Sequence, residues 1–276
     1  MTDTQANLSP LGKKIAYVDQ YDRTLLFPIA RKQKRIEIGI NGELPFHGYD
    51  TWNAFEISWL DSLGKPIVAI ARFDISSDSK NIIESKSFKI YLNSFNNTTF
   101  ESVEQVQSVL KRDIQEAAEG NVEVVIYQVD DCEMESLKKF DGISIDNQAI
   151  SIDTYTVNSD FLTSNKEKRI SETLYSNLLK SNCLVTGQPD WGSVQISYEG
   201  SEIDKAGLLK YIVSFRNHNE FHEQCVERIF VDIMKKCQPE KLTVHARYTR
   251  RGGLDINPVR STEKIHPAEN IRMARQ

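Results

Sequence analysis

A short motif occurs twice in the chain, and its spacing points to an internal duplication. Ser94-Phe95-Asn96-Asn97 returns 120 positions later as Ser214-Phe215-Arg216-Asn217, and Pro66 and Pro189 stand at a similar offset of 123 positions. Four shared residues could arise by chance, so the elements predicted around each copy have to decide. A repeated order of elements would mean that one supersecondary unit was duplicated and builds two similar modules.

Both halves are predicted to contain two strands, a helix and a further strand, in that order. The helices are predicted from apolar residues at helical spacing, and the strands from alternating or continuous apolar runs. In the first half the strands cover residues 66–73, 88–95 and 121–127, and the helix covers about 100–118. In the second half the strands cover residues 193–198, 208–216 and 242–249, and the helix covers 220–237. The matching order favours duplication over chance.

The segments outside this repeat divide the rest of the chain. Residues 1–50 combine proline, glycine and polar residues, which predicts an extended N-terminal arm. Residues 131–180 are predicted to join the halves, with a helix over 167–180 whose apolar residues are spaced by four. We therefore expect an arm (1–50), a first module (51–130), a connecting segment (131–180) and a second module (181–276).

Composition narrows the class of protein. The 276 residues are 39% hydrophobic and 26% charged, which is typical of a globular chain. The net charge of −5 argues against a general nucleic-acid binder, and the basic run 31–35 is interpreted as a solvated loop. No apolar run approaches the ~20 residues of a membrane span, and the polar first ten residues do not resemble a signal peptide. We expect a cytosolic protein that binds neither membranes nor nucleic acid directly.

Cysteine chemistry is the first functional candidate. The cysteines are spread widely along the chain, which in a reducing compartment predicts free thiols: Cys132, Cys183, Cys225 and Cys237. Cys183 is followed seven positions later by Asp190, with glycine and proline shaping the loop between them. A thiolate is a strong nucleophile, and a nearby carboxyl group can return a proton to whatever the thiolate attacks. The pair suggests covalent catalysis, although an isolated cysteine is more often a small buried apolar residue.

Residues 217–223 are predicted to form a polar strand-to-helix junction. Backbone N–H groups at a helix start attract acceptor groups, and Asn217 or Asn219 could cap this helix. On a functional interpretation, Glu223 accepts paired hydrogen bonds from an N–H/NH₂ edge such as that of a guanine-like ring, and His222 adds a polar contact or assists proton transfer. On a structural interpretation, Glu223 only complements the helix dipole and His222 is a surface residue.

Two basic segments could hold phosphate groups. Residues 82–89 are predicted to be a loop that enters a strand and carries Glu84, Ser85 and Lys86. Serine and lysine suit phosphate binding, but lysine is also common on exposed strand edges. Arg251 and Gly252 form a second basic turn, in which glycine allows close approach of the backbone.

Several familiar motifs are absent from the sequence. There is no G-x-G-x-x-G, which argues against a Rossmann-type dinucleotide site, and the glycines at 187 and 192 are not followed by the lysine of a P-loop. There is no close Cys-x-x-Cys pair. Cys183, His222 and Cys225 could in principle bind zinc, but Cys225 lies in the apolar stripe of its predicted helix, which favours a core position.

Three long segments, in this order, resemble the NADPH-dependent 7-cyano-7-deazaguanine reductases in their long, two-module form. They are residues 84–96 (ESKSFKIYLNSFN), 183–192 (CLVTGQPDWG) and 215–223 (FRNHNEFHE). The first resembles the signature motif of the family, the second its nucleophile loop and the third its substrate-binding junction. The resemblance covers nearly the whole chain.

The resemblance implies an α+β fold of tandem tunnelling-fold modules, in which antiparallel sheets are backed by helices, and a homodimer. It implies reduction of the nitrile of 7-cyano-7-deazaguanine to an aminomethyl group by two NADPH, a step towards queuosine in tRNA, without a metal. Cys183 would form a covalent thioimide with the nitrile while Asp190 protonates its nitrogen. The remaining residues would bind substrate (Ile83, Glu84, Ser85, His222 and Glu223) or NADPH (Ser85, Lys86, Arg251 and Gly252).

Two other functions remain open from the sequence. A zinc-dependent cyclohydrolase of the same superfamily would use Cys183 and His222 as metal ligands. A non-catalytic purine- or tRNA-binding module would bind its ligand without consuming NADPH and would tolerate loss of Cys183. No sequence feature favours the binding module.

Overall fold

The computed structural model describes residues 17–130, 137–267 and 270–276, which form two compact units. Among these residues, the first unit comprises 17–33, 50–130 and 250–256. The second comprises 34–49, 137–249, 257–267 and 270–276. Residues 34–49, expected in an N-terminal arm, and 137–180, expected as a connector, therefore both belong to the compact second unit. Cys132, expected to be a free thiol, lies outside the described residues.

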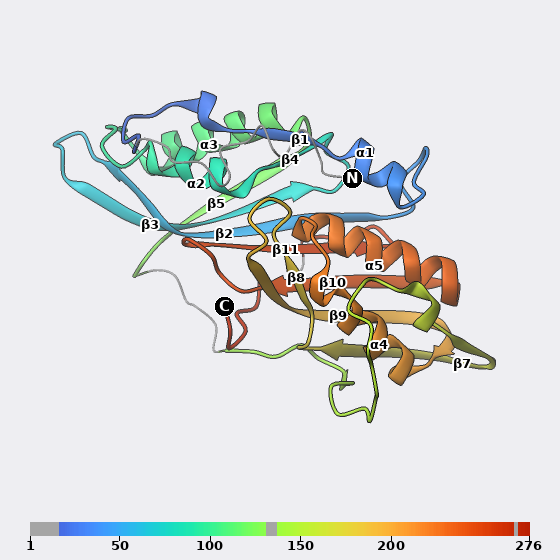
Figure 1. The fold of residues 1–276 in the computed structure, drawn as a ribbon. Helices are drawn as coiled ribbons and strands as arrows, with labels where there is room; N and C mark the ends of the chain where they lie inside the picture. The colour runs from blue at the N-terminus through green and yellow to red at the C-terminus, as the bar shows by residue number, and fades with distance from the viewer. Residues whose placement is uncertain (1–16, 131–136, 268–269) are drawn as a thin grey trace. The chain divides into compact units, whose positions relative to one another are not determined.

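The first unit is an antiparallel sheet covered by helices. Its strands follow the order β5 (Val122–Gln128), β3 (Pro66–Ser76) and β2 (His47–Leu60), and β3 and β5 are antiparallel. A small antiparallel pair joins β1 (Pro28–Ala30) to β4 (Asn81–Ile83). Helices α2 (Ser85–Asn93) and α3 (Val103–Ala118) lie along one face of the sheet (Figure 1). The short helical segment η2 (Arg23–Leu25) precedes β1, and α1 (Lys32–Glu37) lies mostly in the second unit.

The second unit has the same kind of architecture. Its strands follow the order β11 (Leu254–Ser261), β10 (Lys241–Tyr248), β9 (Pro189–Ile203), β7 (Ser164–Ser176) and β6 (Ile143–Ser144). All these pairs are antiparallel except β6 with β7, and β8 (Lys180–Asn182) pairs with the start of β9. The helical segments are η3 (Ser159–Phe161), α4 (Lys205–Ser214), η4 (Phe215–Asn217) and α5 (His222–Cys237).

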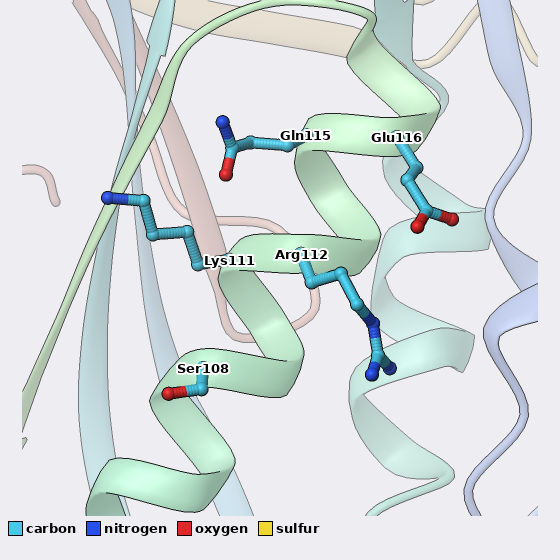
Figure 2. A pocket seen from close by; sticks show the side chains of 5 residues that line it. All are labelled: Ser108, Lys111, Arg112, Gln115 and Glu116. Atoms are coloured by element: carbon cyan, nitrogen blue, oxygen red, sulfur yellow. The ribbon is translucent and has the colours of Figure 1, made fainter.

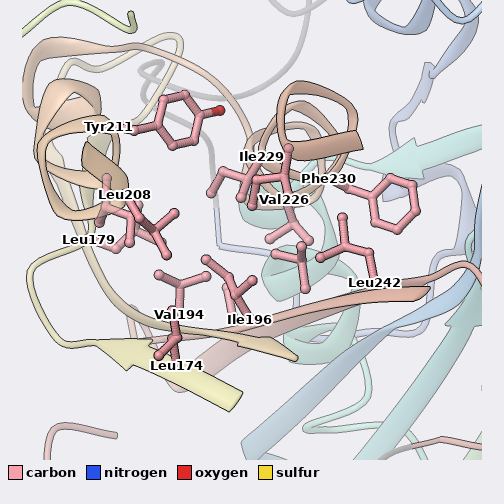
Figure 3. Close-up of a cluster of buried hydrophobic side chains, with 14 of the residues drawn as sticks. Leu174, Leu179, Val194, Ile196, Leu208, Tyr211, Val226, Ile229, Phe230 and Leu242 are labelled. Carbon is pink, nitrogen blue, oxygen red and sulfur yellow. The ribbon is translucent and has the colours of Figure 1, made fainter. Parts of the chain in front are cut away.

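Each unit has its own apolar core between helices and sheet. In the second unit, leucine, isoleucine and aromatic side chains of α4 and α5 pack against β7, β9 and β10. Figure 3 shows part of this cluster, including Val194, Leu208 and Ile229. In the first unit, aromatic residues of α2 fill the same layer, and Phe88 packs edge-on against Trp52 and Phe73. No helix among the described residues is long and apolar enough to cross a membrane.

The order of elements supports the predicted duplication. The first unit runs β2, β3, α2, α3, β5, and the second runs β7, β9, α4, α5, β10. The repeated Ser-Phe-x-Asn motif closes α2 and α4 in the same way, because Ser94 Oγ donates to the Tyr91 carbonyl and Ser214 Oγ donates to the Tyr211 carbonyl, both at 2.6 Å. In addition, Tyr91 donates to Asp113 of α3 at 2.8 Å, and Tyr211 donates to Asp232 of α5 at 2.7 Å. The repeated unit is therefore strand, strand, helix, helix, strand.

Two predicted strands were wrong, because both are helices. The prediction for 88–95 falls on α2, whose N-cap Glu84 accepts hydrogen bonds from the backbone of Lys86 and Ser87. The prediction for 208–216 falls on α4 and η4, where Asp204 plays the same capping role. An N-cap side chain accepts hydrogen bonds from the backbone N–H groups two and three residues later. It can therefore start a helix even where the apolar content alone suggests a strand. The site segments 82–89 and 217–223 consequently lie at a strand-to-helix and a helix-to-helix junction.

Two further predictions were wrong. The helix expected over 167–180 is largely strand β7, which pairs with β9 along most of its length. The basic run 31–35 is not a wholly solvated loop, because Arg31 is 3% exposed and pairs with Asp50 at 2.6 Å, and Arg35 is 8% exposed and pairs with Glu227 at 2.7 Å. The other predicted elements correspond to β3, α3, β5, β9, α5 and β10, and most of their ends agree within a few residues. The largest difference is in β9, which begins four residues earlier and ends five residues later than predicted.

Candidate functional site

Cys183 lies at the tip of a hairpin made by β8 and β9. The strands pair Ser181 with Asp190, and beyond the last pair the Cys183 N–H donates to the Gln188 carbonyl at 2.8 Å. The Gly187 N–H then donates to the Cys183 carbonyl at 3.0 Å and closes the loop. The segment between Cys183 and Asp190 is therefore a tight hairpin. These two residues, seven positions apart in the sequence, lie on its two arms.

The hairpin places Cys183 and Asp190 on one face. Residues directly opposite each other in an antiparallel pair point to the same side, and so do residues two apart along a strand. Ser181 and Cys183 therefore share a face with Asp190. Burial agrees with this alternation, since Ser181 is 0%, Asp190 4% and Cys183 7% exposed, whereas Trp191 on the other face is 38% exposed. The predicted nucleophile and the predicted acid are thus brought together.

The junction 217–223 runs beside the outer edge of β8. The Asn182 N–H donates to the His218 carbonyl at 2.7 Å, and the Glu220 N–H donates to the Asn182 carbonyl at 3.2 Å. The side-chain amide of Asn182 also donates to Asn219 Oδ1 at 3.1 Å. These bonds fix the hairpin to the residues that lead into α5.

The start of α5 delivers the other two predicted residues of the second unit. His222 is the first residue of α5, and its Nε2 lies 3.5 Å from Asp190 Oδ2. Glu223 follows it and is 3% exposed. A buried carboxylate in the first turn of a helix is stabilised by the helix dipole and suits a ligand edge that presents hydrogen-bond donors.

Glu220 anchors this junction through charge. Its carboxylate accepts hydrogen bonds from Arg228 at 2.6 and 3.0 Å and contacts His218 Nε2 at 2.9 Å. Burial raises the pKa of the Glu220 carboxyl, but the hydrogen bonds from His218 and Arg228 outweigh that effect and lower the pKa to about 2. Glu220 is therefore a permanent anion that ties the junction to the body of α5.

The remaining predicted residues lie in the first unit, at the start of α2. Ile83 ends β4, and Glu84 is fully buried with both carboxylate oxygens accepting backbone N–H groups, from Lys86 at 2.7 Å and Ser87 at 2.8 Å. Burial raises the pKa of the Glu84 carboxyl against these hydrogen bonds. Glu84 thus has a capping role that the sequence analysis did not assign to it. Ser85 and Lys86 are half-buried in the first turn of α2.

Arg251 and Gly252 belong to a tight turn that is tied to the same helix. The Arg251 N–H donates to the Leu254 carbonyl at 2.8 Å, and Gly252 and Gly253 have φ values of +58° and +77°. Positive φ at both central residues is the requirement of a type I′ turn, which glycine meets without strain. Lys89 of α2 donates to the Gly252 carbonyl and to Glu56. Lys89 therefore ties this turn to the helix whose first residues are Ser85 and Lys86.

A pocket elsewhere on the described part of the chain carries a different set of groups. Figure 2 shows a pocket on α3 lined by Ser108, Lys111, Arg112, Gln115 and Glu116, which are polar side chains of a single helix. None of the predicted site residues lines it. Within the described ranges, no three His, Cys, Asp or Glu side chains are grouped so that they could hold a metal ion.

Comparison with known proteins identifies the family. A family model described as nitrile reductase, 7-cyano-7-deazaguanine-reductase N-term matches residues 17–126, and one described as QueF-like protein matches residues 189–267. A protein from Cupriavidus pinatubonensis named NADPH-dependent 7-cyano-7-deazaguanine reductase is 56% identical over 97% of this chain and 98% of its own length. The chain belongs to the 7-cyano-7-deazaguanine reductase family.

Other members of this reductase family are similarly close. Proteins of the same name from Paraburkholderia phytofirmans and Burkholderia thailandensis are each 55% identical over 97% of this chain and 98% of their own length. A crystal structure of the archaeosine synthase QueF-Like in the apo form is 15% identical, with a TM-score of 0.31 over 38% of this chain and all of that one, which is too slight to support an argument.

The structure places further residues beside the candidate site that the sequence did not reveal. Tyr248 of β10 is fully buried, and its ring stacks on His222 with centroids 3.8 Å apart and planes 2° apart. Lys180 donates to Asn182 Oδ1 and to the Arg216 carbonyl, both at 2.6 Å, and burial, with Arg216 nearby, lowers its pKa. Only strand register could have found these residues, because Tyr248 pairs with Gly192 of β9.

Proposed function

We propose that the protein reduces the nitrile of 7-cyano-7-deazaguanine to the aminomethyl group in queuosine biosynthesis, at the expense of two NADPH and through a covalent thioimide. The observation that carries the proposal is the shared face of Cys183 and Asp190, with His222 against Asp190 and Glu223 buried beside it. The printed names of the relatives support the same reaction.

The residues of the second unit divide the chemistry among them. The Cys183 sulfur bonds to the nitrile carbon while Asp190 gives a proton to the nitrile nitrogen, which yields a thioimide. Once that carbon has been reduced, the carbon–sulfur bond breaks, Cys183 is released and an imine remains for the second reduction. Overall, one nitrile takes up two hydrides and two protons and becomes one primary amine. Glu223 accepts hydrogen bonds from the N–H/NH₂ edge of the deazaguanine ring, and His222 holds Asp190.

The first unit supplies groups that fit NADPH. This cofactor supplies the hydride when it is bound. Ser85 and Lys86 offer a hydroxyl and an ammonium group at the start of α2, which suits phosphate. Lys89 holds the Gly252 turn near that helix start, so the Arg251 side chain adds positive charge to the same region. Ile83, Glu84 and Ser85 are proposed to contact the substrate as well.

The wider features of the family form part of the same proposal. The two sheets backed by helix pairs are consistent with tandem tunnelling-fold modules, of which the first carries the cofactor residues and the second the nucleophile. We further propose a homodimer in the cytosol that needs no metal and acts on the free base rather than on nucleic acid.

Oxidation of NADPH by the purified, chelator-treated protein, with and without 7-cyano-7-deazaguanine, tests the proposal. We expect two NADPH consumed per nitrile, and none by Cys183→Ala. Cys237→Ala is the matched control, because Cys237 is a buried thiol whose pKa burial raises to about 11, and the variant should keep full activity. A Cys183→Ala protein that turns over, or activity that appears only after zinc is added, would refute the reductase.

A further inference from the structure

The imidazole of His222 is held by a ring rather than by hydrogen bonds. Its Nε2 meets Asp190 at 3.5 Å, which is long for a hydrogen bond, and its Nδ1 is buried with no hydrogen-bond partner among the described residues. A histidine usually owes its ring orientation to the partner of its second nitrogen. Here the parallel Tyr248 ring, 3.8 Å away, is what fixes the imidazole plane.

Tyr248 is itself rigidly placed. It is 0% exposed, its N–H donates to Asn257 Oδ1 at 3.3 Å, and its carbonyl accepts from Gln276 Nε2 at 3.1 Å. Gln276 Nε2 also donates to Asn257 Oδ1 at 2.8 Å, which links the two anchors. The ring therefore has little freedom to follow a displaced imidazole.

Gly192 makes room for this ring. It stands opposite Tyr248 in the β9–β10 register, and a Cβ added there would lie 3.1 and 3.2 Å from two carbons of the Tyr248 ring. Such distances are shorter than ordinary carbon contacts. Gly192, the last residue of the segment 183–192, therefore leaves the space that the Tyr248 ring occupies. The ring in turn stacks on His222.

The Tyr248 hydroxyl contributes little to this arrangement. It is buried beside the Cys225 and Ser181 side chains, but it makes no hydrogen bond of ordinary geometry among the described residues. Burial raises the pKa of the phenol far above its usual range, and Cys225 and Asp190 add to the effect. The hydroxyl stays protonated, so Tyr248 acts as an aromatic surface and not as an acid or base.

We infer that Tyr248 is a positioning residue for the proposed reductase, whose ring holds the His222 imidazole against Asp190 during proton delivery to the nitrile nitrogen. The inference rests on the proposed function. It predicts that the ring matters and the hydroxyl does not. It also predicts that Tyr248 acts only through His222.

A double-mutant cycle on covalent adduct formation tests this directly, with 7-cyano-7-deazaguanine and no NADPH, followed by intact-protein mass spectrometry. We expect Tyr248→Leu to slow the adduct about tenfold or more, as misplaced groups do, and Tyr248→Phe to restore most of the rate. In a His222→Ala background, Tyr248→Leu should have less than about a twofold further effect. Equal factors in both backgrounds would overturn the inference.

Two further variants protect the test against simple misfolding. Gly192→Ala displaces the ring without removing it and should give the same non-additive pattern. Tyr198→Leu is the matched control, because Tyr198 is also a buried tyrosine. Its hydroxyl donates to Glu172 and accepts from the Ile203 N–H, and neither partner is hydrogen-bonded to His222. Any effect of Tyr198→Leu should be the same factor in both backgrounds.

A measurement without substrate separates this inference from the proposed function. The chain has five histidines, so the ring ¹⁵N signals of selectively labelled protein can be assigned, with His222→Gln identifying its own signal. Tyr248→Leu should shift or broaden the His222 signal, and Tyr248→Phe should not. An unchanged signal in Tyr248→Leu refutes the positioning role whatever the reaction, whereas failure of NADPH oxidation by the unchanged protein refutes the reductase.

Discussion

Asp190 illustrates how a single side chain acquires a role from its neighbours. It is nearly buried, faces the same side of the hairpin as Cys183, and contacts His222 at 3.5 Å. A carboxyl group placed on this face can pass a proton to an atom that is bonded to Cys183. The neutral amide of an asparagine would preserve the shape of the site but could not supply that proton.

Asp190→Asn is therefore expected to slow thioimide formation by about 10² or more, the usual contribution of a positioned general acid. Substrate affinity, measured by calorimetry in the inert Cys183→Ala background, should change much less. A variant that forms the adduct at the wild-type rate would remove Asp190 from the mechanism.

Glu84 has two possible roles that its duplicated counterpart can separate. Both Glu84 and Asp204 cap a helix by accepting two backbone N–H groups, but only Glu84 belongs to the proposed substrate site. We expect Glu84→Ala and Asp204→Ala each to lower the free energy of unfolding by about 1–2 kcal/mol, the cost of a lost N-cap. Urea denaturation measures this.

Only Glu84→Ala should also raise the KM for the nitrile substrate. Should the KM stay at the wild-type value in Glu84→Ala as it does in Asp204→Ala, Glu84 is a capping residue alone. Because the caps are chemically alike, a loss of stability cannot by itself account for a difference between the two variants.

At the scale of elements, the helices α2 and α4 show what the sequence reveals and what it hides. Phe88, Tyr91, Leu92 and Phe95 recur at helical spacing, so the information for a helix was present in the segment predicted as a strand. The helix-starting signal lay in Glu84, an N-cap type that is less common than serine or aspartate. Glu84 as an N-cap, together with this spacing, predicts the helix that the structure shows.

Strand β7 could not have been recognised in this way. Ile170, Leu174 and Leu178 are spaced by four, and four is close to the period of a helix and also a multiple of the strand period of two. Local sequence therefore fits both structures equally well. The hydrogen-bonded register with β9, in which Leu174 faces Ile196, decides in favour of the strand.

The site was predictable only in part, because a local pattern reveals residue types but not strand pairing. Residue types and order within the three segments pointed to Cys183, Asp190, His222 and Glu223, and the structure brings these four together in one unit. Tyr248 and Lys180 escaped notice because their roles depend on strand pairing, which is not written in any local pattern.

Helix α5, which carries His222 and Glu223, is held at its middle by a buried ion cluster. Glu227 accepts hydrogen bonds from Arg35 at 2.7 and 2.9 Å and from Arg260 at 2.9 and 3.2 Å, and all three side chains are buried. Removal of one partner from such a cluster leaves buried charge uncompensated.

Glu227→Ala is accordingly expected to lower the free energy of unfolding by about 3 kcal/mol or more, measured by urea denaturation. Asp160→Ala is the control, because it removes a solvent-exposed pair with Lys236 of the same helix and should leave the urea midpoint unchanged. Equal midpoints for Glu227→Ala and the wild type would mean that the cluster does not stabilise α5.

At the scale of the molecule, the two units differ in the elements that carry the proposed site residues. The first unit joins β2 to β3 by a tight turn at Asp61–Lys65, whereas the second inserts β8 and the Cys183 loop between β7 and β9. Conversely, α2 begins with Ser85-Lys86-Ser87, and α4 begins with Lys205-Ala206-Gly207, which lacks the hydroxyl groups. The second unit therefore carries the hairpin of the proposed nucleophile, and the first unit carries the hydroxyl-bearing helix start.

The stability of the whole protein should depend on pH through His245. This residue of β10 packs edge-on against Phe140, and burial, with the charge of Arg247 nearby, lowers its pKa from 6.5 to about 3. The unfolded chain therefore binds a proton more readily than the folded one. The stabilising contribution of neutral His245 is complete above pH 6.5 and is lost as the pH falls from 6.5 towards 3.

Between pH 7.5 and pH 5 this effect should cost roughly 2 kcal/mol of unfolding free energy, since each pH unit below the unfolded pKa contributes about 1.4 kcal/mol. His245→Gln, which cannot titrate, should lose correspondingly less over the same interval, although its stability at pH 7.5 will be lower because of imperfect packing. Urea denaturation of both proteins at the two pH values gives the difference. Parallel losses would mean that His245 can take up a proton without cost in the folded state, and that the interior of the second unit is more accessible to water than its packing indicates.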